Sequence, residues 1–234
     1  MTVVEHEGTL YGLGRTVWHD PASWGFQAAT APLKTTWHKR LGPILDQGQL
    51  GACTGFATAG AMNTEPIEHA GRRLLGNADA IALYSWATHH DPYPGAYPPQ
   101  DTGSSGLAAA KAAKRLGLIA GYSHAFGIDH VLGALVVGPI IVGVPWRKPM
   151  FDPAPVTGIL SIDGPDEGGH ELELCGVDVE RELVVVPNSW GTGWGIPAPE
   201  CGITTPGTCR IRFTDLDALL RAGGDATVLR PAAG

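Results

Sequence analysis

The stretch Val184–Gly195 reads Val-Val-Val-Pro-Asn-Ser-Trp-Gly-Thr-Gly-Trp-Gly. Its three valines predict a buried β-strand, because β-branched side chains favour extended backbone. Asn188 stands at the end of that strand, and the tryptophans and glycines after it predict a tight loop. A polar amide placed where a strand meets a loop is a candidate functional group.

Two further stretches carry candidate groups. In Gly168–Asp178, His170 opens a strand whose following residues alternate between polar and apolar. In Asp46–Ala57, a glycine-bearing loop brings Cys53 to the start of a helix, where backbone N–H groups favour a thiolate. Taken singly, His170 is better explained as a hydrogen-bonded structural residue, and a small buried cysteine explains Cys53 as well as a nucleophile does.

Together, the three stretches resemble the papain-like cysteine peptidases. Cys53, His170 and Asn188 occur in the family's order, with the histidine and the asparagine far downstream of the cysteine. The run that begins at Asn188 matches the family motif residue for residue. Gln47 precedes Cys53 at the position of the family's oxyanion-hole glutamine. The resemblance covers about residues 40–230.

The resemblance implies a role for each of these residues. Cys53 would be the nucleophile, and His170 would be its base and later the acid for the leaving amine. Asn188 would orient His170, as a carboxylate does in a serine triad. Gln47 and the Cys53 backbone N–H would form the oxyanion hole. Trp190 would shield the bond between His170 and Asn188 from water.

The resemblance also implies a substrate-binding strip. Gly103 and Ser104 match the segment whose backbone pairs with the substrate peptide, and Gly169 lies beside the catalytic histidine. Gly168 and Gly169 supply no side chain to the wall of the S2 pocket, so a subsite preference does not follow. Trp194 belongs to the supporting Trp/Gly loop.

The sequence also departs from the family. Leu50 replaces the cysteine that usually forms a disulfide in the helical lobe, and Thr54 replaces the aromatic residue after the nucleophile. Both changes resemble the bacterial and phage branch. Residues 1–40 are too short and too rich in Gly and Pro for the usual helical propeptide. We therefore expect an extended arm that runs over the outside of the two lobes and leaves the cleft open.

The order of elements favours an α+β fold with two lobes and a cleft between them. We expect a peptidase domain at 41–234, with a helical lobe at about 45–130 and an antiparallel β lobe at about 131–234. Periodicity and helix breakers predict helices at 53–65, 78–89, 105–116, 129–136 (capped by Asp129) and 215–221. Runs of Val, Ile and Leu predict strands at 35–38, 140–144, 159–162, 171–177, 183–186, 209–213 and 226–229.

The segment Ile196–Thr208 is an insertion relative to the family, and we expect an exposed loop on the β lobe. Cys201 and Cys209 could bridge across it, although a chain without a secretion signal should keep them reduced in the cell. Cys175 is predicted to pack as a small apolar residue.

Composition limits the partners. The 234 residues carry 23 acidic and 16 basic side chains, a net charge of −7, which argues against a nucleic-acid partner. The most apolar stretch, Val131–Trp146, is too short for a membrane span and contains prolines. We expect a peptide or protein substrate, no cofactor, no metal, and a cytoplasmic or virion-associated location. The oligomeric state stays open.

The leading function is therefore a cysteine endopeptidase. Two alternatives remain: a papain-fold amidase or acyltransferase that acts on cell-wall peptides, and a non-catalytic relative that binds peptides in its cleft. The intact set of Gln47, Cys53, His170 and Asn188 argues against the last alternative.

Overall fold

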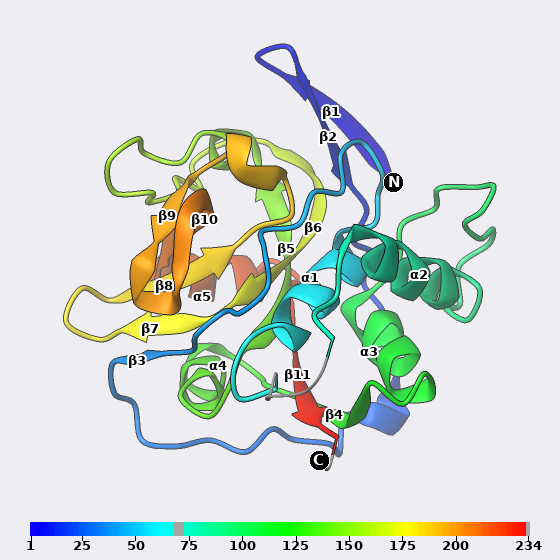
Figure 1. Ribbon diagram of the computed structural model, residues 1–234, viewed down its shortest axis with the longest axis horizontal. Coiled ribbons are helices and arrows are strands. Elements are labelled where there is room, and N and C mark those ends of the chain that lie inside the picture. The colour runs from blue at the N-terminus through cyan, green and yellow to red at the C-terminus, as the bar shows by residue number, and fades with distance from the viewer. Residues whose placement is uncertain (68–72, 233–234) are drawn as a thin grey trace.

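The computed structural model describes residues 1–67 and 73–232. Helices α1 (Cys53–Met62), α2 (Asn77–Thr88) and α3 (Gly106–Arg115) gather on one side, and a strand-rich lobe forms the other side (Figure 1). The predicted α+β class with a helical lobe followed by an antiparallel β lobe is thus confirmed. Within the described residues, no helix is both long and apolar enough to cross a membrane.

The helical lobe is built around α1, which is buried along its whole length. Gly55 lets α1 approach α2 closely, since a Cβ there would lie 2.8 Å from the backbone nitrogen of Tyr84. Helix α3 begins after Ser105, whose hydroxyl accepts a hydrogen bond from the Ala108 N–H at 3.1 Å. Small residues and a capping serine therefore explain why this stretch forms tightly packed helices.

Two antiparallel sheets, of four and five strands, form the framework of the β lobe. The first has the order β4 (Ile119–His124), β11 (Asp225–Pro231), β5 (Ile140–Arg147) and β6 (Asp166–Leu174). The second has the order β3 (Thr36–Trp37), β7 (Gly176–Asp178), β8 (Leu183–Pro187), β10 (Ile203–Arg212) and β9 (Ile196–Ala198). Helices α4 (Ile128–Leu135) and α5 (Phe213–Arg221) pack on the core that these strands share. Short 3₁₀ helices lie at Pro21–Ser23, Lys148–Phe151, Gly191–Gly193 and Pro199–Cys201.

The register of the first sheet positions the candidate histidine. In the β5–β6 pair, Val144 lies opposite His170, and Gly143 lies opposite Glu171. Since successive side chains of a strand point to opposite faces, the side chains of His170 and Glu171 lie on opposite faces of the sheet. The chain leaves this sheet at Cys175 and enters the second sheet, so the predicted strand at 171–177 is divided between β6 and β7.

The N-terminal residues form a hairpin that the sequence did not predict. Strands β1 (Thr2–His6) and β2 (Thr9–Leu13) pair antiparallel, with His6 opposite Thr9. The turn residues Glu7 and Gly8 both have positive φ, which matches the twist of a two-residue hairpin loop. In Figure 1 the hairpin projects from the body next to the label N.

The predicted exposed loop at Ile196–Thr208 is wrong. The segment contains β9 and the first part of β10, and it buries Ala198, Cys201 and Ile203. These side chains form a small core with Cys175 and Val185, so burial of apolar surface orders the segment. Cys201 Sγ lies 3.6 Å from the Cys175 carbonyl oxygen, and all four cysteines of the chain, which lie within the described residues, are free.

Two smaller predictions also need correction. Residues 159–162 contribute an isolated bridge between Ile159 and Arg210 rather than a strand. Gly127, not Asp129, is the N-cap of α4, and Asp129 lies in the first turn, where its charge still favours the helix. Sequence patterns identify elements better than their ends because several residues near a terminus satisfy the same preferences.

Candidate active site

Cys53 is the first residue of α1, and its side chain is buried. Burial raises the pKa of its thiol to about 12, and the nearby carboxylate of Glu171 adds to that rise. Hydrogen bonds from the backbone of Glu171, Gly14 and Thr54 favour the thiolate but do not outweigh the burial. The thiol is therefore protonated at neutral pH in this form of the chain.

His170 and Asn188 meet at the interface between the two sheets. The His170 Nε2 atom lies 2.8 Å from Asn188 Oδ1, so the ring donates through Nε2 and leaves Nδ1 as the acceptor. Nδ1 is buried without a hydrogen-bond partner among the described residues. Burial lowers the pKa of His170 to about 4, against the opposing effect of the Asn188 hydrogen bond. The expected contact between His170 and the Asn188 side-chain oxygen is thus present.

Tryptophans enclose this histidine. The Trp190 ring stacks on His170 with centroids 4.6 Å apart, and Trp146 meets the same ring edge-on at 4.9 Å. Trp194 meets Trp190 edge-on at 5.3 Å and donates from Nε1 to the Phe151 carbonyl at 2.7 Å. Such packing fixes the ring plane of His170 and keeps water from its hydrogen bond.

Gln47 lies in the loop before α1. Its Oε1 accepts from the Ser189 hydroxyl at 2.6 Å, which sets the orientation of the amide. Its Nε2 donates to the carbonyl oxygens of Leu50 at 2.7 Å and Gly12 at 3.1 Å. The predicted oxyanion donor is therefore already bound to a carbonyl oxygen of the N-terminal arm.

The prediction that the arm leaves the site open is wrong. The Arg15 N–H donates to the Gly169 carbonyl at 3.0 Å. The Ser104 N–H donates to the Gly14 carbonyl at 2.8 Å, and the Thr16 N–H donates to the Ser104 carbonyl at 2.6 Å. The arm therefore passes between the two segments predicted to bind substrate, and it covers Cys53.

Glycines make this close passage possible. A Cβ on Gly14 would lie 2.6 Å from the Gly51 Cα and closer still to its carbonyl group. Gly12 presses in the same way on the carbonyl groups of Gln49 and Leu50. The arm thus needs residues without side chains on the face that meets the loop before α1.

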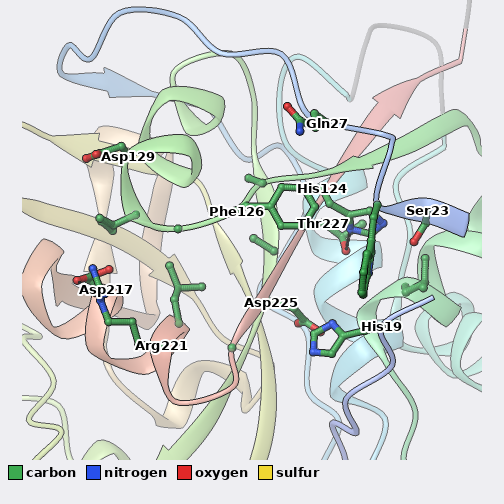
Figure 2. Close-up of a pocket in the computed structure, with 18 of the residues that line it drawn as sticks. His19, Ser23, Gln27, His124, Phe126, Asp129, Asp217, Arg221, Asp225 and Thr227 are labelled. Carbon is green, nitrogen blue, oxygen red and sulfur yellow. Dashed lines mark hydrogen bonds and ion pairs between the residues drawn. The ribbon is translucent and has the colours of Figure 1, made fainter. Parts of the chain in front are cut away.

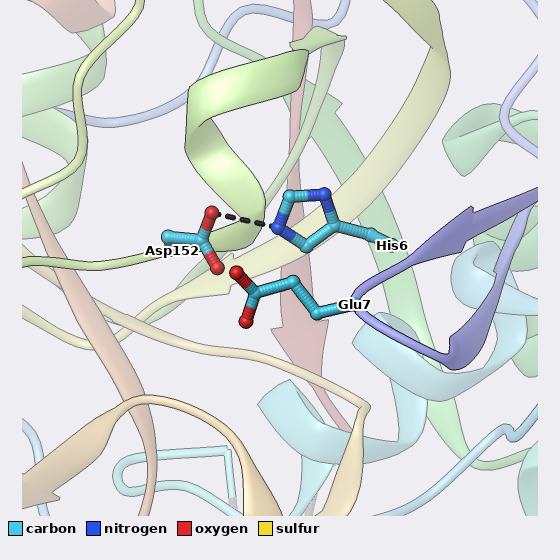
Figure 3. Close-up of side chains that lie close together, drawn as sticks. All are labelled: His6, Glu7 and Asp152. Carbon is cyan, nitrogen blue, oxygen red and sulfur yellow. Dashed lines mark hydrogen bonds and ion pairs between the residues drawn. The ribbon is translucent and has the colours of Figure 1, made fainter.

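The hairpin tip fastens the arm to the β lobe (Figure 3). His6 Nε2 lies 2.7 Å from Asp152 Oδ2, and the His6 ring stacks on Phe151 with centroids 5.2 Å apart. Tyr11 of the same hairpin packs against Trp190, with ring centroids 4.5 Å apart, and Trp190 is the ring that stacks on His170. The potential ligand atoms of His6, Glu7 and Asp152 lie within 4.8 Å of one another. Among the described residues, this is the group that could hold a metal ion.

Three residues that the sequence analysis missed line the path of the arm. Arg15 places its side chain inside the body, where it pairs with Asp225 at 3.2 Å. Glu171 is buried beside this pair. A charged residue directly after His170 in an apolar strand was a signal for Glu171, whereas nothing in the sequence indicated Asp225.

A cavity of about 810 Å³, with Asp225 in its lining, lies beside residues 18–27 of the arm (Figure 2). Residues of the arm, of the β4–α4 connection, of α5 and of β11 line it, among them His19, His124, Phe126 and Thr227. Asp225 is shared between this cavity and the site of Arg15.

Solved structures of cysteine proteases share this architecture. Xylellain from Xylella fastidiosa superposes with a TM-score of 0.68 at 17% identity, over 99% of this chain and 100% of its own. Procathepsin L 3 from Tenebrio molitor superposes with a TM-score of 0.58 at 16% identity, over 94% of this chain and 75% of its own. The protease CMS1MS2 from Carica candamarcensis, in complex with E-64, superposes with a TM-score of 0.56 at 16% identity, over 83% of this chain and 95% of its own.

No family model and no curated protein matches the sequence. The similarity to cysteine proteases therefore rests on the fold. Helices lie on one side of Cys53 and antiparallel strands that carry His170 lie on the other, as in a cleft between two lobes. The chain has the two-lobed fold of the papain-like cysteine proteases.

Proposed function

We propose that this chain is a cysteine endopeptidase and that its N-terminal arm holds it in a blocked state. The observation that carries the proposal is the 2.8 Å contact between His170 Nε2 and Asn188 Oδ1, which leaves Nδ1 free as a base. Backbone hydrogen bonding from Glu171, the residue after His170, to the Cys53 sulfur supports a common site for thiol and imidazole.

The chemistry would be acyl transfer to sulfur. Nδ1 of His170 takes the thiol proton while Cys53 Sγ attacks the peptide carbonyl, and the amide π electrons move to oxygen. The Gln47 amide and the Cys53 backbone N–H stabilise that oxyanion. His170 then returns the proton to the leaving amine, and a water molecule hydrolyses the thioester with His170 again as the base. Asn188 keeps the ring in the required tautomer throughout.

In the blocked state this chemistry does not start. The Gly12 carbonyl occupies the Gln47 amide, and the Gly14 N–H faces the sulfur. The arm thus presents an amide nitrogen to the nucleophile rather than a carbonyl carbon, so it is not a substrate in this position. Burial also keeps both Cys53 and His170 uncharged at neutral pH, since it raises one pKa and lowers the other.

The test is a peptide-library digestion by the full chain, by an Arg15→Ala variant that weakens the arm, and by Arg15→Ala/Cys53→Ala as a control. We expect cleavage by the single variant and none by the double variant. Cleavage confined to cell-wall peptides would instead support an amidase. Binding without any cleavage would support a peptide-binding protein and refute the proposal.

A further inference from the structure

Arg15 is the arm residue that enters the body most deeply. Its backbone lies between Ser104 and Gly169, and its side chain is 3% exposed. It follows Gly14, the residue whose backbone faces Cys53. The Arg15 side chain therefore marks a pocket one residue away from the residue that meets the nucleophile.

Acceptor groups of the body converge on the guanidinium in this pocket. Arg15 Nη2 donates to the Gly223 carbonyl at 2.8 Å and lies 3.2 Å from Asp225 Oδ1. The Glu171 carboxyl borders the same space: a Cβ at Gly143 would lie 2.7 Å from Glu171 Oε2 and 2.5 Å from Asp225 Oδ1. The absence of a side chain at Gly143 thus leaves room for the arginine.

The pocket is unfavourable for the body without a cation. Glu171 is buried, and its Oε2 atom has no hydrogen-bond partner among the described residues. Burial raises its pKa well above the usual range, Asp225 adds to the rise, and Arg15 opposes it. Among the described ion pairs, Asp225 pairs with Arg15 alone. Without the arm, Asp225 therefore lacks a cationic partner, and Glu171 Oε2 lacks a hydrogen-bond donor among the described residues of the body.

We propose that the Arg15 pocket is the specificity pocket of the enzyme. A substrate would run opposite to the arm, with a carbonyl where the Gly14 N–H now faces the sulfur, so the pocket selects arginine immediately before the residue whose carbonyl is attacked. This inference rests on the proposed peptidase function. When the arm leaves, a substrate arginine replaces Arg15 against Asp225, Glu171 and the Gly223 carbonyl. The planar guanidinium donates to several of these acceptors at once, so arginine should be preferred over lysine, and lysine over leucine.

The test uses blocked dipeptide substrates with a fluorogenic amide after a constant arginine and with Arg, Lys or Leu before it. The enzyme is the full chain with Gly14→Ala or, separately, Arg15→Ala, either of which should vacate the pocket. We expect kcat/KM for the Arg substrate to exceed that for the Leu substrate by about 10- to 100-fold, the usual range for hydrogen bonds to a charged group.

Two added substitutions identify the groups responsible. Asp225→Asn should reduce the ratio of Arg to Leu to less than about threefold, because the carboxylate supplies most of the charge. Asp217→Asn is the matched control: Asp217 lines the neighbouring cavity but pairs with Arg221, so the ratio should stay unchanged. A Leu substrate cleaved as well as the Arg substrate would overturn the inference, as would a ratio that survives Asp225→Asn.

A binding experiment separates this inference from the peptidase function. If no substrate is cleaved, the proposed function fails, and protection of Cys53 from iodoacetamide by Arg-containing or Leu-containing peptide amides then tests the pocket alone. Stronger protection by the Arg peptide in Gly14→Ala, lost in Gly14→Ala/Asp225→Asn, would support the pocket assignment. Equal protection by both peptides would refute it.

Discussion

Replacing Gly14 with alanine should uncover Cys53. The added Cβ would lie 2.6 Å from the Gly51 Cα and closer to the Gly51 carbonyl, well inside van der Waals contact. Gly51 belongs to the loop that leads into the buried helix α1, so its backbone cannot move aside without disturbing the core. The arm should therefore lift from the site while the body keeps its fold.

The expected gain in the rate of Cys53 alkylation follows from the pKa of its thiol. Burial raises the pKa of Cys53 to about 12. At that value about one thiol in 10⁵ is ionised at pH 7, against about three in 100 for a solvated cysteine of pKa ~8.5. Since the thiolate is the reacting species, uncovering should accelerate alkylation by about 10³-fold, and easier access adds to that factor.

The assay is the rate of iodoacetamide labelling at pH 7, followed by peptide mapping that separates Cys53 from Cys175, Cys201 and Cys209. Gly25→Ala is the control, because it lies in the same arm and a Cβ there would meet no atom within 4 Å. Near-ultraviolet circular dichroism checks that the body stays folded. If Gly14→Ala labels Cys53 no more than tenfold faster than Gly25→Ala, the reasoning fails.

Two further changes test other parts of the molecule. In the unblocked enzyme, Gln47→Ala should lower kcat by about 10²-fold through the loss of one oxyanion donor, and an unchanged kcat would remove Gln47 from the mechanism. Arg40→Ala should lower the free energy of unfolding by about 3–5 kcal/mol, because it leaves the Glu173 carboxylate buried without its cation, and a loss below about 1 kcal/mol in urea unfolding would contradict that assignment.

The residues of the candidate site could be named from the sequence because three stretches together resemble a known family, and two of these residues lie at the ends of predicted elements. Asn188 follows a strand and Cys53 starts a helix, as predicted, whereas His170, predicted to open a strand, lies in the middle of β6. The contact between Asn188 and His170 joins the residue after β8 to the middle of β6. Ser189 was not predicted as the group that orients Gln47, since nothing local connects a loop serine to a glutamine on the other lobe.

The arm could not be placed from the sequence because a glycine fits either a loop or a segment that packs closely against other backbone. Gly12 and Gly14 indicate a loop when only local backbone freedom is considered. In the structure they are extended residues that press on another segment, and Leu13 and Arg15 between and after them are buried in the body. The useful signal was therefore the alternation of glycine with side chains that need burial, rather than the glycine content.

The arm and a substrate would compete for the same hydrogen bonds. The arm uses the Gln47 amide, both backbone groups of Ser104 and the Gly169 carbonyl, four bonds in all. At about 1 kcal/mol net for each bond, they favour the blocked state by about 4 kcal/mol, close to a thousandfold. A tethered segment also acts at a millimolar effective concentration, so a free peptide at micromolar concentration displaces it poorly. The ion pair of Arg15 with Asp225 adds to these four bonds, so the parent chain should show residual turnover of at most about one part in a thousand, and the fraction of open molecules rather than the chemical step should limit its rate.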